Sequence, residues 1–94
     1  RIDAVALGLT HPQPQVRCAT IAALGRMQRP EASAAIRTAL DDEDAGVRES
    51  AVVALERLGA RGIARKFALM AREDPSRAVR RAAAAAAGGD AGAR

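Results

Sequence analysis

The chain has 94 residues, 49% of them apolar, and a formal charge of +4 at neutral pH. This length suits a single domain. Because 25 of the apolar residues are alanine and Phe67 is the sole aromatic, the core must be small. The lone Cys18 excludes an internal disulfide and a cysteine-based metal site. The longest uncharged apolar run, residues 82–89, is too short to cross a bilayer, and we expect a cytoplasmic protein.

Three related segments follow one another along the chain. A Val-Arg pair recurs at 16–17, 47–48 and 79–80. Around the first two pairs, "HPQPQVRCATIAALGRM" aligns with "DEDAGVRESAVVALERL", and "DPSRAVRRAAAAAAGG" follows the same template. His11 therefore stands where Asp42 and Asp74 stand in the later copies. Such spacing indicates a repeat architecture, and the abundance of alanine, leucine and arginine predicts that it is all-α.

Each complete copy is expected to form two helices. In residues 45–58 the apolar positions follow a helical stripe, with aspartates before it that suit a helix start and Gly59 after it as a stop. Second helices are expected at 31–40 and 61–72. The predicted domain spans 1–87 and consists of a lone helix at 2–9, a repeat at 11–40, a repeat at 42–72 and a half repeat at 74–87, followed by a flexible tail at 88–94.

The acidic residues and the Val-Arg pair form the predicted joint between repeats. We expect the valine to fill the core between repeats. The arginine can reach aspartate side chains and the carbonyls of neighbouring turns with its planar fork of donors. At a fixed repeat step, these side chains would form a structural ladder whose members are Arg17, Arg48, Arg80, Asp42 and Asp74.

The pattern Asp-x-x-x-x-Val-Arg-x-x-Ala, followed by Ala-Leu and a closing Gly, is complete at 42–59. It resembles the HEAT-like repeats of the phycobilisome (PBS) lyase type, and the resemblance covers nearly the whole chain. In the first copy His11 replaces the aspartate, and the third copy lacks the leucine and the second helix. The resemblance implies a right-handed α-solenoid of antiparallel helix pairs, about six helices in all, with second helices along the inner curve.

No set of residues indicates a catalytic or metal site. His11 has no second histidine to share a metal or orient a base, so we expect it to cap or pair at its turn. Cys18 suits a small, partly buried hydrophobe, with covalent attachment or a redox role as the alternative. The acidic cluster 41–44 lacks the ligand spacing of a calcium loop and favours helix capping. We expect no cofactor and no catalytic activity.

One surface feature bears on function. Arg61, Arg65 and Arg72 are spaced four and seven residues apart, which places them on one face of a second helix. Arg37 lies on the equivalent helix one repeat earlier. If second helices line the concave side, these four arginines form a basic strip that faces a partner. The alternative is a solvated helix face that keeps the array soluble.

The leading hypothesis is a non-catalytic protein-interaction or scaffold module that binds a partner through its concave face. Because the chain begins at Arg1, we expect a fragment of a longer protein. The resemblance implies an alternative, a bilin lyase-like or other prosthetic-group-handling enzyme subunit, although one aromatic is a poor basis for a pigment pocket. A further alternative is binding of nucleic-acid backbone by the basic strip, which the net charge of −4 over residues 31–60 opposes.

The last segment, "AVRRAAAAAAGG", presents a bare alanine face that another helix could approach closely. We expect this end, or the helix at 2–9, to pack on another repeat, either in an intact longer protein or in a second copy of the chain.

Overall fold

The structure is a computed structural model that describes residues 2–92. Its elements are α1 (Ile2–Ala6), the 3-10 helix η1 (Leu7–Thr10), α2 (Pro14–Met27), α3 (Pro30–Arg37), the 3-10 helix η2 (Thr38–Asp41), α4 (Ala45–Arg57), α5 (Ala64–Glu73) and α6 (Arg77–Gly92). Each 3-10 segment directly extends the α-helix before it, so the described residues form six helical rods and no strand. The all-α helical-repeat fold predicted from the sequence is confirmed.

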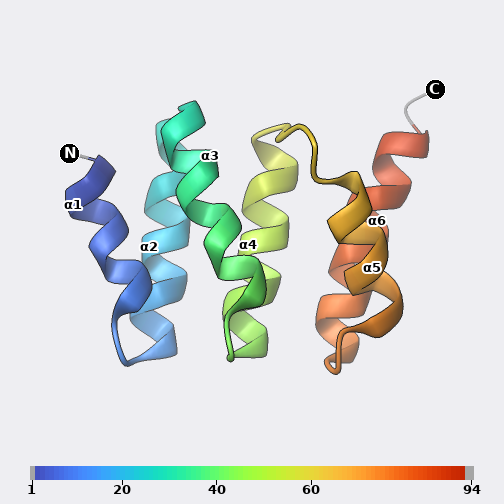
Figure 1. The fold of residues 1–94 in the computed structure, drawn as a ribbon, viewed down its shortest axis with the longest axis horizontal. Coiled ribbons are helices and arrows are strands. Elements are labelled where there is room, and N and C mark those ends of the chain that lie inside the picture. Colours follow the sequence, from blue (N-terminus) through green and yellow to red (C-terminus); the bar gives the residue numbers. More distant parts are fainter. Residues whose placement is uncertain (1, 93–94) are drawn as a thin grey trace.

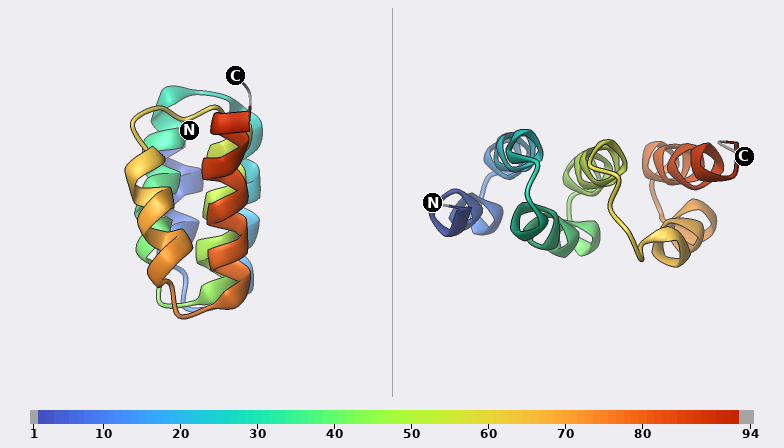
Figure 2. Two further views of the ribbon diagram at one scale, coloured as in Figure 1. Left: turned by 90° about the vertical axis from the view of Figure 1, so that its right-hand side faces the viewer. Right: turned by 90° about the horizontal axis from the view of Figure 1, so that it is seen from above.

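The rods form two layers. Figure 1 shows them side by side along the long axis of the molecule, and Figure 2, seen from above, separates the layers. The first layer contains α2, α4 and α6, and the second layer contains α1 with η1, α3 with η2, and α5. The molecule measures 36 × 27 × 15 Å. It is a flat slab because each helix pair packs only on its neighbours in sequence.

The core lies between the layers and repeats with the sequence. Ile21 and Val52 occupy equivalent positions in α2 and α4, and both are fully buried. The valines of the second and third Val-Arg pairs, Val47 and Val79, are also fully buried, as expected for residues that fill the space between repeats. Val16 is only half-buried, because no first-layer helix precedes α2 in the structure.

The helix ends show how local sequence sets the boundaries. Helix α4 closes in a Schellman motif: the N–H of Ala60 donates to the carbonyl of Leu55, and that of Gly59 to the carbonyl of Glu56, both at 3.0 Å. Gly59 has φ of 65° and supplies the left-handed residue that this motif needs. In the first repeat the equivalent residue, Gln28, adopts φ of 54° without being glycine, a costly conformation for a residue with a Cβ.

Two boundaries differ from the sequence prediction. The second helix predicted at 61–72 begins at Ala64, because the loop that follows α4 carries a second left-handed residue, Gly62, with φ of 70°. Helix α6 continues through Gly92, beyond residue 87 where the predicted half repeat ends, and the flexibility predicted for 88–94 stays a prediction. The alanine run extends the helix past the glycines because residues 82–92 contain no proline and each glycine costs only about 1 kcal/mol relative to alanine. Residues 93–94 lie outside the described residues.

Candidate interaction surfaces

Arg17 joins the first repeat to the second. Its Nε donates to Oδ2 of Asp42 at 2.9 Å, and its Nη2 donates to Oδ1 at 3.0 Å. Its third nitrogen, Nη1, donates to the carbonyls of His11 and Pro12, in the turn before its own helix, at 2.6 and 3.1 Å. Arg17 is only 6% exposed. The pair is therefore shielded from water, where a bidentate charged contact is stronger and more selective in geometry than at the surface.

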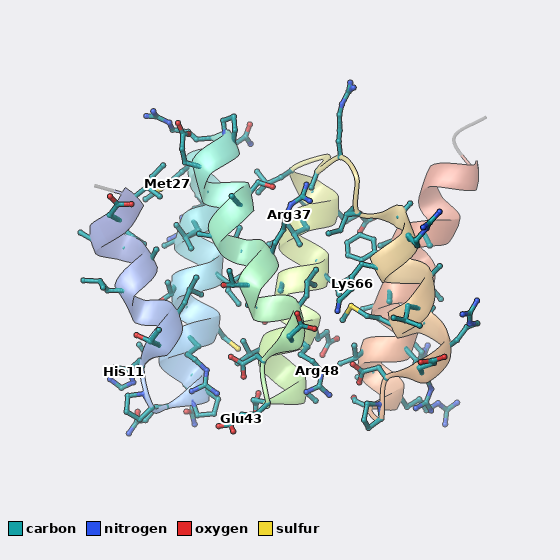
Figure 3. The ribbon with its side chains drawn as sticks, in the orientation of Figure 1. His11, Met27, Arg37, Glu43, Arg48 and Lys66 are labelled. Carbon is teal, nitrogen blue, oxygen red and sulfur yellow. The ribbon has the colours of Figure 1, made fainter. Side chains whose placement is uncertain are left out.

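Arg48 repeats this arrangement between the second repeat and the third. Its Nε and Nη2 donate to Oδ2 and Oδ1 of Asp74 at 2.9 and 3.0 Å. Its Nη1 donates to the carbonyls of Asp42 and Glu43 at 2.8 and 3.1 Å. Figure 3 shows Arg48 at the same end of the helices as His11 and Glu43. We call the series formed by Arg17, Arg48 and Arg80 the arginine ladder.

Arg80 holds the third position of the ladder with only half of these contacts. Its Nη1 donates to the carbonyls of Asp74 and Pro75 at 2.8 and 3.2 Å, as in the other two repeats. Within residues 2–88, the part of the chain with described side chains, no carboxylate accepts a hydrogen bond from its Nε or Nη2. Each arginine of the ladder thus binds the turn of its own repeat, and the first two also bind the aspartate of the next.

The ladder alters the acid–base chemistry of its members. The hydrogen bond from Arg48 is the main reason why the pKa of Asp74 lies below its ordinary value. The N–H of Ser76 and the charges of Arg48 and Arg80 act in the same direction, and burial opposes them. The pKa values of Arg17 and Arg48 are raised, chiefly by their hydrogen bonds to the aspartates. Each of these three shifts favours the charged form of its group, so folding stabilises Arg17, Arg48 and Asp74 as ions.

The aspartates also shape the turns that precede the first-layer helices. In Asp42 and Asp74, Oδ1 accepts the backbone N–H two residues later at 2.9 Å, which fixes the local turn. His11 does the same with its Nδ1, which lies 3.0 Å from the backbone nitrogen of Gln13. This confirms the prediction that His11 caps a turn in place of an aspartate.

The acidic cluster 41–44 divides into separate contacts. Asp44 caps α4 by accepting the N–H of Val47 at 3.0 Å, which confirms the expected capping. Asp41 pairs with Lys66 of α5 at 2.6 Å, in an exposed contact. In the described part of the chain, no group of three or more His, Cys, Asp or Glu side chains is arranged to hold a metal ion.

The four arginines of the predicted basic strip do not share one helical face. Arg65 and Arg72 are exposed on α5, seven residues apart. Arg61 precedes α5 in the loop that contains Gly62, so helical spacing does not apply to it. Arg37 is half-buried at the end of α3, and its Nη2 donates to the carbonyl of Arg61. The structure brings Arg37 and Arg61 together, and leaves Arg65 and Arg72 on α5.

Arg37 and Arg61 border a cleft in the second layer, between α3 and the loop before α5. The cleft has a volume of about 610 Å³. It is lined by Gln28, Arg29, Pro30, Ser33, Ala34, Arg37, Leu58, Gly59, Ala60 and Arg61. Arg29 has a weak contact of 3.6 Å with Glu31, and both side chains are 63% exposed, so its charge remains available to a ligand. We call this feature the arginine cleft.

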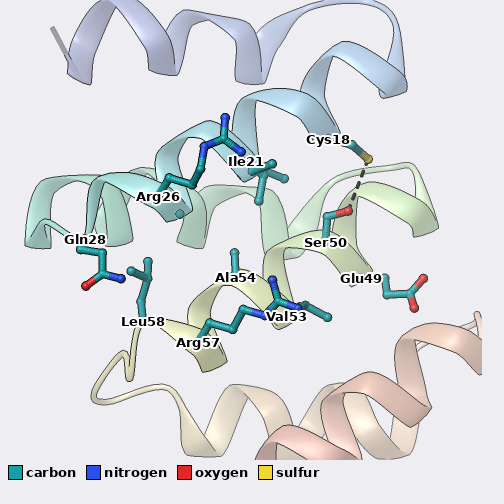
Figure 4. Close-up of a pocket in the computed structure, with 12 residues that line it drawn as sticks. Cys18, Ile21, Arg26, Gln28, Glu49, Ser50, Val53, Ala54, Arg57 and Leu58 are labelled. Atoms are coloured by element: carbon teal, nitrogen blue, oxygen red, sulfur yellow. Dashed lines mark hydrogen bonds between the residues drawn. The ribbon is translucent and has the colours of Figure 1, made fainter.

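A second hollow, missed by the sequence analysis, lies on the outer face of the first layer between α2 and α4. It has a volume of about 600 Å³ and a floor of small apolar residues that includes Ala22, Gly25 and Ala54. Arg26 and Arg57, which are equivalent in the two repeats, border it (Figure 4). The repeat spacing gave one signal for it, since it places the equivalent Arg26 and Arg57 on adjacent helices of the first layer.

Cys18 borders the same hollow. It is half-buried and packs against the core, as the sequence predicted. Its Sγ lies 3.5 Å from the hydroxyl oxygen of Ser50, which can donate a weak hydrogen bond to the sulfur; Figure 4 draws this contact as a dashed line. None of the helices in the described residues is long and apolar enough to span a membrane.

These features define a class of protein: stacked helix pairs held in register by arginine–aspartate contacts that recur at the repeat spacing form a helical-repeat protein. The family model for HEAT repeats matches residues 2–88. The chain therefore belongs to the HEAT-repeat family, whose members generally mediate protein–protein interactions. The match is to HEAT repeats in general, so the phycobilisome lyase type remains a prediction. Comparison with curated proteins finds no match.

Proposed function

We propose that this chain is a non-catalytic interaction module that binds an acidic segment of a partner protein across its second layer. The observation that carries the proposal is the arginine cleft. Arg37 and Arg61 both line it and contact each other, and Arg65 and Arg72 continue the positive charge along α5. Repeat proteins commonly bind partners through an extended surface built from equivalent helices.

The chemistry of the cleft favours a carboxylate-bearing protein segment. Guanidinium groups bind carboxylates in a planar, bidentate manner. Arg61, Arg65 and Arg72 make no ion pair with any side chain that the structure describes, so binding would not first have to break one. Apolar lining residues such as Pro30, Ala34 and Leu58 would contact the aliphatic parts of the segment.

The experiment is a titration with a fluorescent peptide of alternating glutamate and leucine. A triple variant, R61S with R65S and R72S, is compared with a matched variant, R26S with R77S and R81S, which removes the same charge from the first layer. The proposal predicts about tenfold weaker binding for the second-layer variant, equal to about 1.4 kcal/mol, and little change for the first-layer variant. Equal losses in both variants would show that only net charge matters and would contradict the proposal.

The same basic residues make binding of nucleic acid a second candidate function. A titration with duplex DNA at several salt concentrations separates the two, because neutralised phosphates give a steep decrease of affinity with salt. Tight, salt-sensitive binding of DNA and indifference to the peptide would favour the second candidate. For the prosthetic-group alternative we find no supporting feature, since the sole aromatic, Phe67, is 3% exposed and belongs to the core.

A further inference from the structure

The arginine cleft has positive charge that no carboxylate in its lining offsets. Three of the residues that line it are arginines, namely Arg29, Arg37 and Arg61, and none is aspartate or glutamate. The hollow between α2 and α4 differs in this respect, because Glu49 lies in its lining together with two arginines. The arginine cleft can therefore accept a ligand group with more negative charge than a single carboxylate.

Arg37 is held in position at this cleft by a neutral acceptor. It is half-buried, and its Nη2 donates to the backbone carbonyl of Arg61. Figure 3 shows it extending from the end of α3 toward the loop before α5. It forms no ion pair with any side chain that the structure describes. Its guanidinium has five N–H donors, so this contact orients the group, lowers the entropy lost on binding and leaves donors for an anion.

Arg29 and Arg61 can supply two more guanidinium groups at little cost. The contact of Arg29 with Glu31 is 3.6 Å long and 63% exposed on both sides, so it contributes little to stability. Arg61 is exposed and contacts Arg37 through its backbone carbonyl, which leaves its side chain free to turn toward a ligand. Both charges are thus available without the loss of a strong contact.

These donors suit a phosphate monoester better than a carboxylate. A phosphorylated side chain carries a charge of about −1.5 to −2 at neutral pH and three strong acceptor oxygens, whereas a carboxylate carries one charge on two oxygens. Arginine binds phosphate in the same bidentate manner as it binds carboxylate. The hydroxyl of Ser33 and the amide of Gln28, which also line the cleft, can add neutral donors.

We propose that the arginine cleft binds a phosphoserine within the acidic segment of the partner protein. The phosphate accepts hydrogen bonds from Arg29, Arg37 and Arg61, and the apolar residues of the cleft contact the neighbours of the phosphoserine. The cleft volume of about 610 Å³ lies in the range of ordinary ligand pockets. This inference rests on the proposed function, because it specifies the group that the same cleft recognises.

The experiment compares three fluorescent peptides of alternating glutamate and leucine that differ at one central position. This position is phosphoserine, glutamate or serine, and binding to the whole chain is measured by fluorescence anisotropy. The variant R29S with R61S removes two guanidinium groups from the cleft and keeps the backbone carbonyl that orients Arg37. The matched variant, R77S with R81S, removes the same charge from α6 in the first layer. Circular dichroism first establishes that both variants are folded.

We expect the wild-type chain to bind the phosphoserine peptide about tenfold more tightly than the glutamate peptide, because the phosphate forms more charge-assisted hydrogen bonds. The variant R29S with R61S should lose this preference, and the variant R77S with R81S should retain it. A preference that persists in R29S with R61S would overturn the inference, because the phosphate would then be bound elsewhere.

The glutamate peptide separates this inference from the proposed function. Equal affinities of the phosphoserine and glutamate peptides would overturn the inference and leave the proposed function intact. If the wild-type chain binds none of the three peptides, both fail. Duplex DNA is added as a competitor in a final titration. Displacement of the phosphoserine peptide by DNA at a lower concentration of phosphate groups would overturn the inference in favour of nucleic acid.

Discussion

Arg48 and Asp74 are 26 residues apart in sequence and are joined by two parallel hydrogen bonds of 2.9 and 3.0 Å. The exposed fractions of their side chains are 13% and 6%. Arg17 and Asp42 form a pair with the same two distances. The contact between consecutive helix pairs is thus repeated atom for atom, and each pair orients its neighbour.

Breaking this contact should destabilise the protein strongly. We expect R48M, which keeps most of the aliphatic stem, to lower the free energy of unfolding by about 3 kcal/mol, because Asp74 is left buried without its counter-charge. The measurement is urea denaturation followed by circular dichroism. K66M is the control, since the pair of Lys66 with Asp41 is exposed (35% and 75%) and should contribute less than about 1 kcal/mol. Similar losses in both variants would contradict the structural role of the ladder.

The contribution of Asp74 should depend on pH. Its pKa is lowered on folding, so its ion pair stabilises the folded state fully above the unfolded-state pKa of about 4. This stabilisation is lost as the pH falls through the lower pKa of the folded state. We expect the difference in unfolding free energy between wild type and D74N to be largest near pH 7 and to shrink below about pH 4. A difference that stays constant down to pH 2.5 would contradict this linkage.

Replacing the left-handed residue at the end of α2 should stabilise the protein. Gln28 has φ of 54° where the next repeat has Gly59 with φ of 65°. We expect Q28G to stabilise the protein by about 0.5 to 1 kcal/mol, because glycine adopts this conformation without strain.

The reverse change, G59Q, serves as its control. A Cβ at Gly59 would meet no atom within 4 Å, so backbone strain alone should destabilise this variant, by about 1 kcal/mol. Thermal denaturation of both variants tests the pair, and changes of the same sign would contradict the explanation.

Gly8 allows the first rod to approach α2 closely. A Cβ built at Gly8 would lie 2.0 Å from Oγ1 of Thr20, whose hydroxyl donates to the carbonyl of Val16 at 2.8 Å. We expect G8A to destabilise the protein by about 1 to 3 kcal/mol through overpacking.

The substitution T20A should restore part of this loss when combined with G8A. The test is a double-mutant cycle measured by urea denaturation. If the two substitutions are simply additive, the contact between Gly8 and Thr20 does not limit the packing of the first rod.

The sequence predicted the architecture well because successive repeats carry the same residue types at the same spacing. The Val-Arg pairs, the aspartates and the closing Gly59 are local signals for helix starts, helix ends and buried positions, and the six helical rods within residues 2–92 follow in the expected order. The end of the last helix was placed too early for a local reason too: the glycines at 88–89 suggested an end, whereas the alanine run before them extends α6 to Gly92.

The candidate surfaces were less predictable because they depend on distances between segments. Helical spacing placed Arg61 with Arg65 and Arg72, but the left-handed Gly62 delays the start of α5 and leaves Arg61 in a loop, where its carbonyl contacts Arg37 beside a cleft. The hollow between α2 and α4 is likewise a property of two helices that pack side by side. Residue spacing alone gives no distance between them.

By itself the sequence determined the class of fold, the order of the rods and the turn that His11 caps, because these follow from propensity, periodicity and hydrogen bonds within a few residues. Only the tertiary structure decided which aspartate each arginine binds. The partner is the one in the next repeat, 25 or 26 residues later, because stacking brings that turn against the anchored guanidinium. For Arg80 the structure shows only the contacts of Nη1 with the turn of its own repeat, and none with a carboxylate among the described side chains.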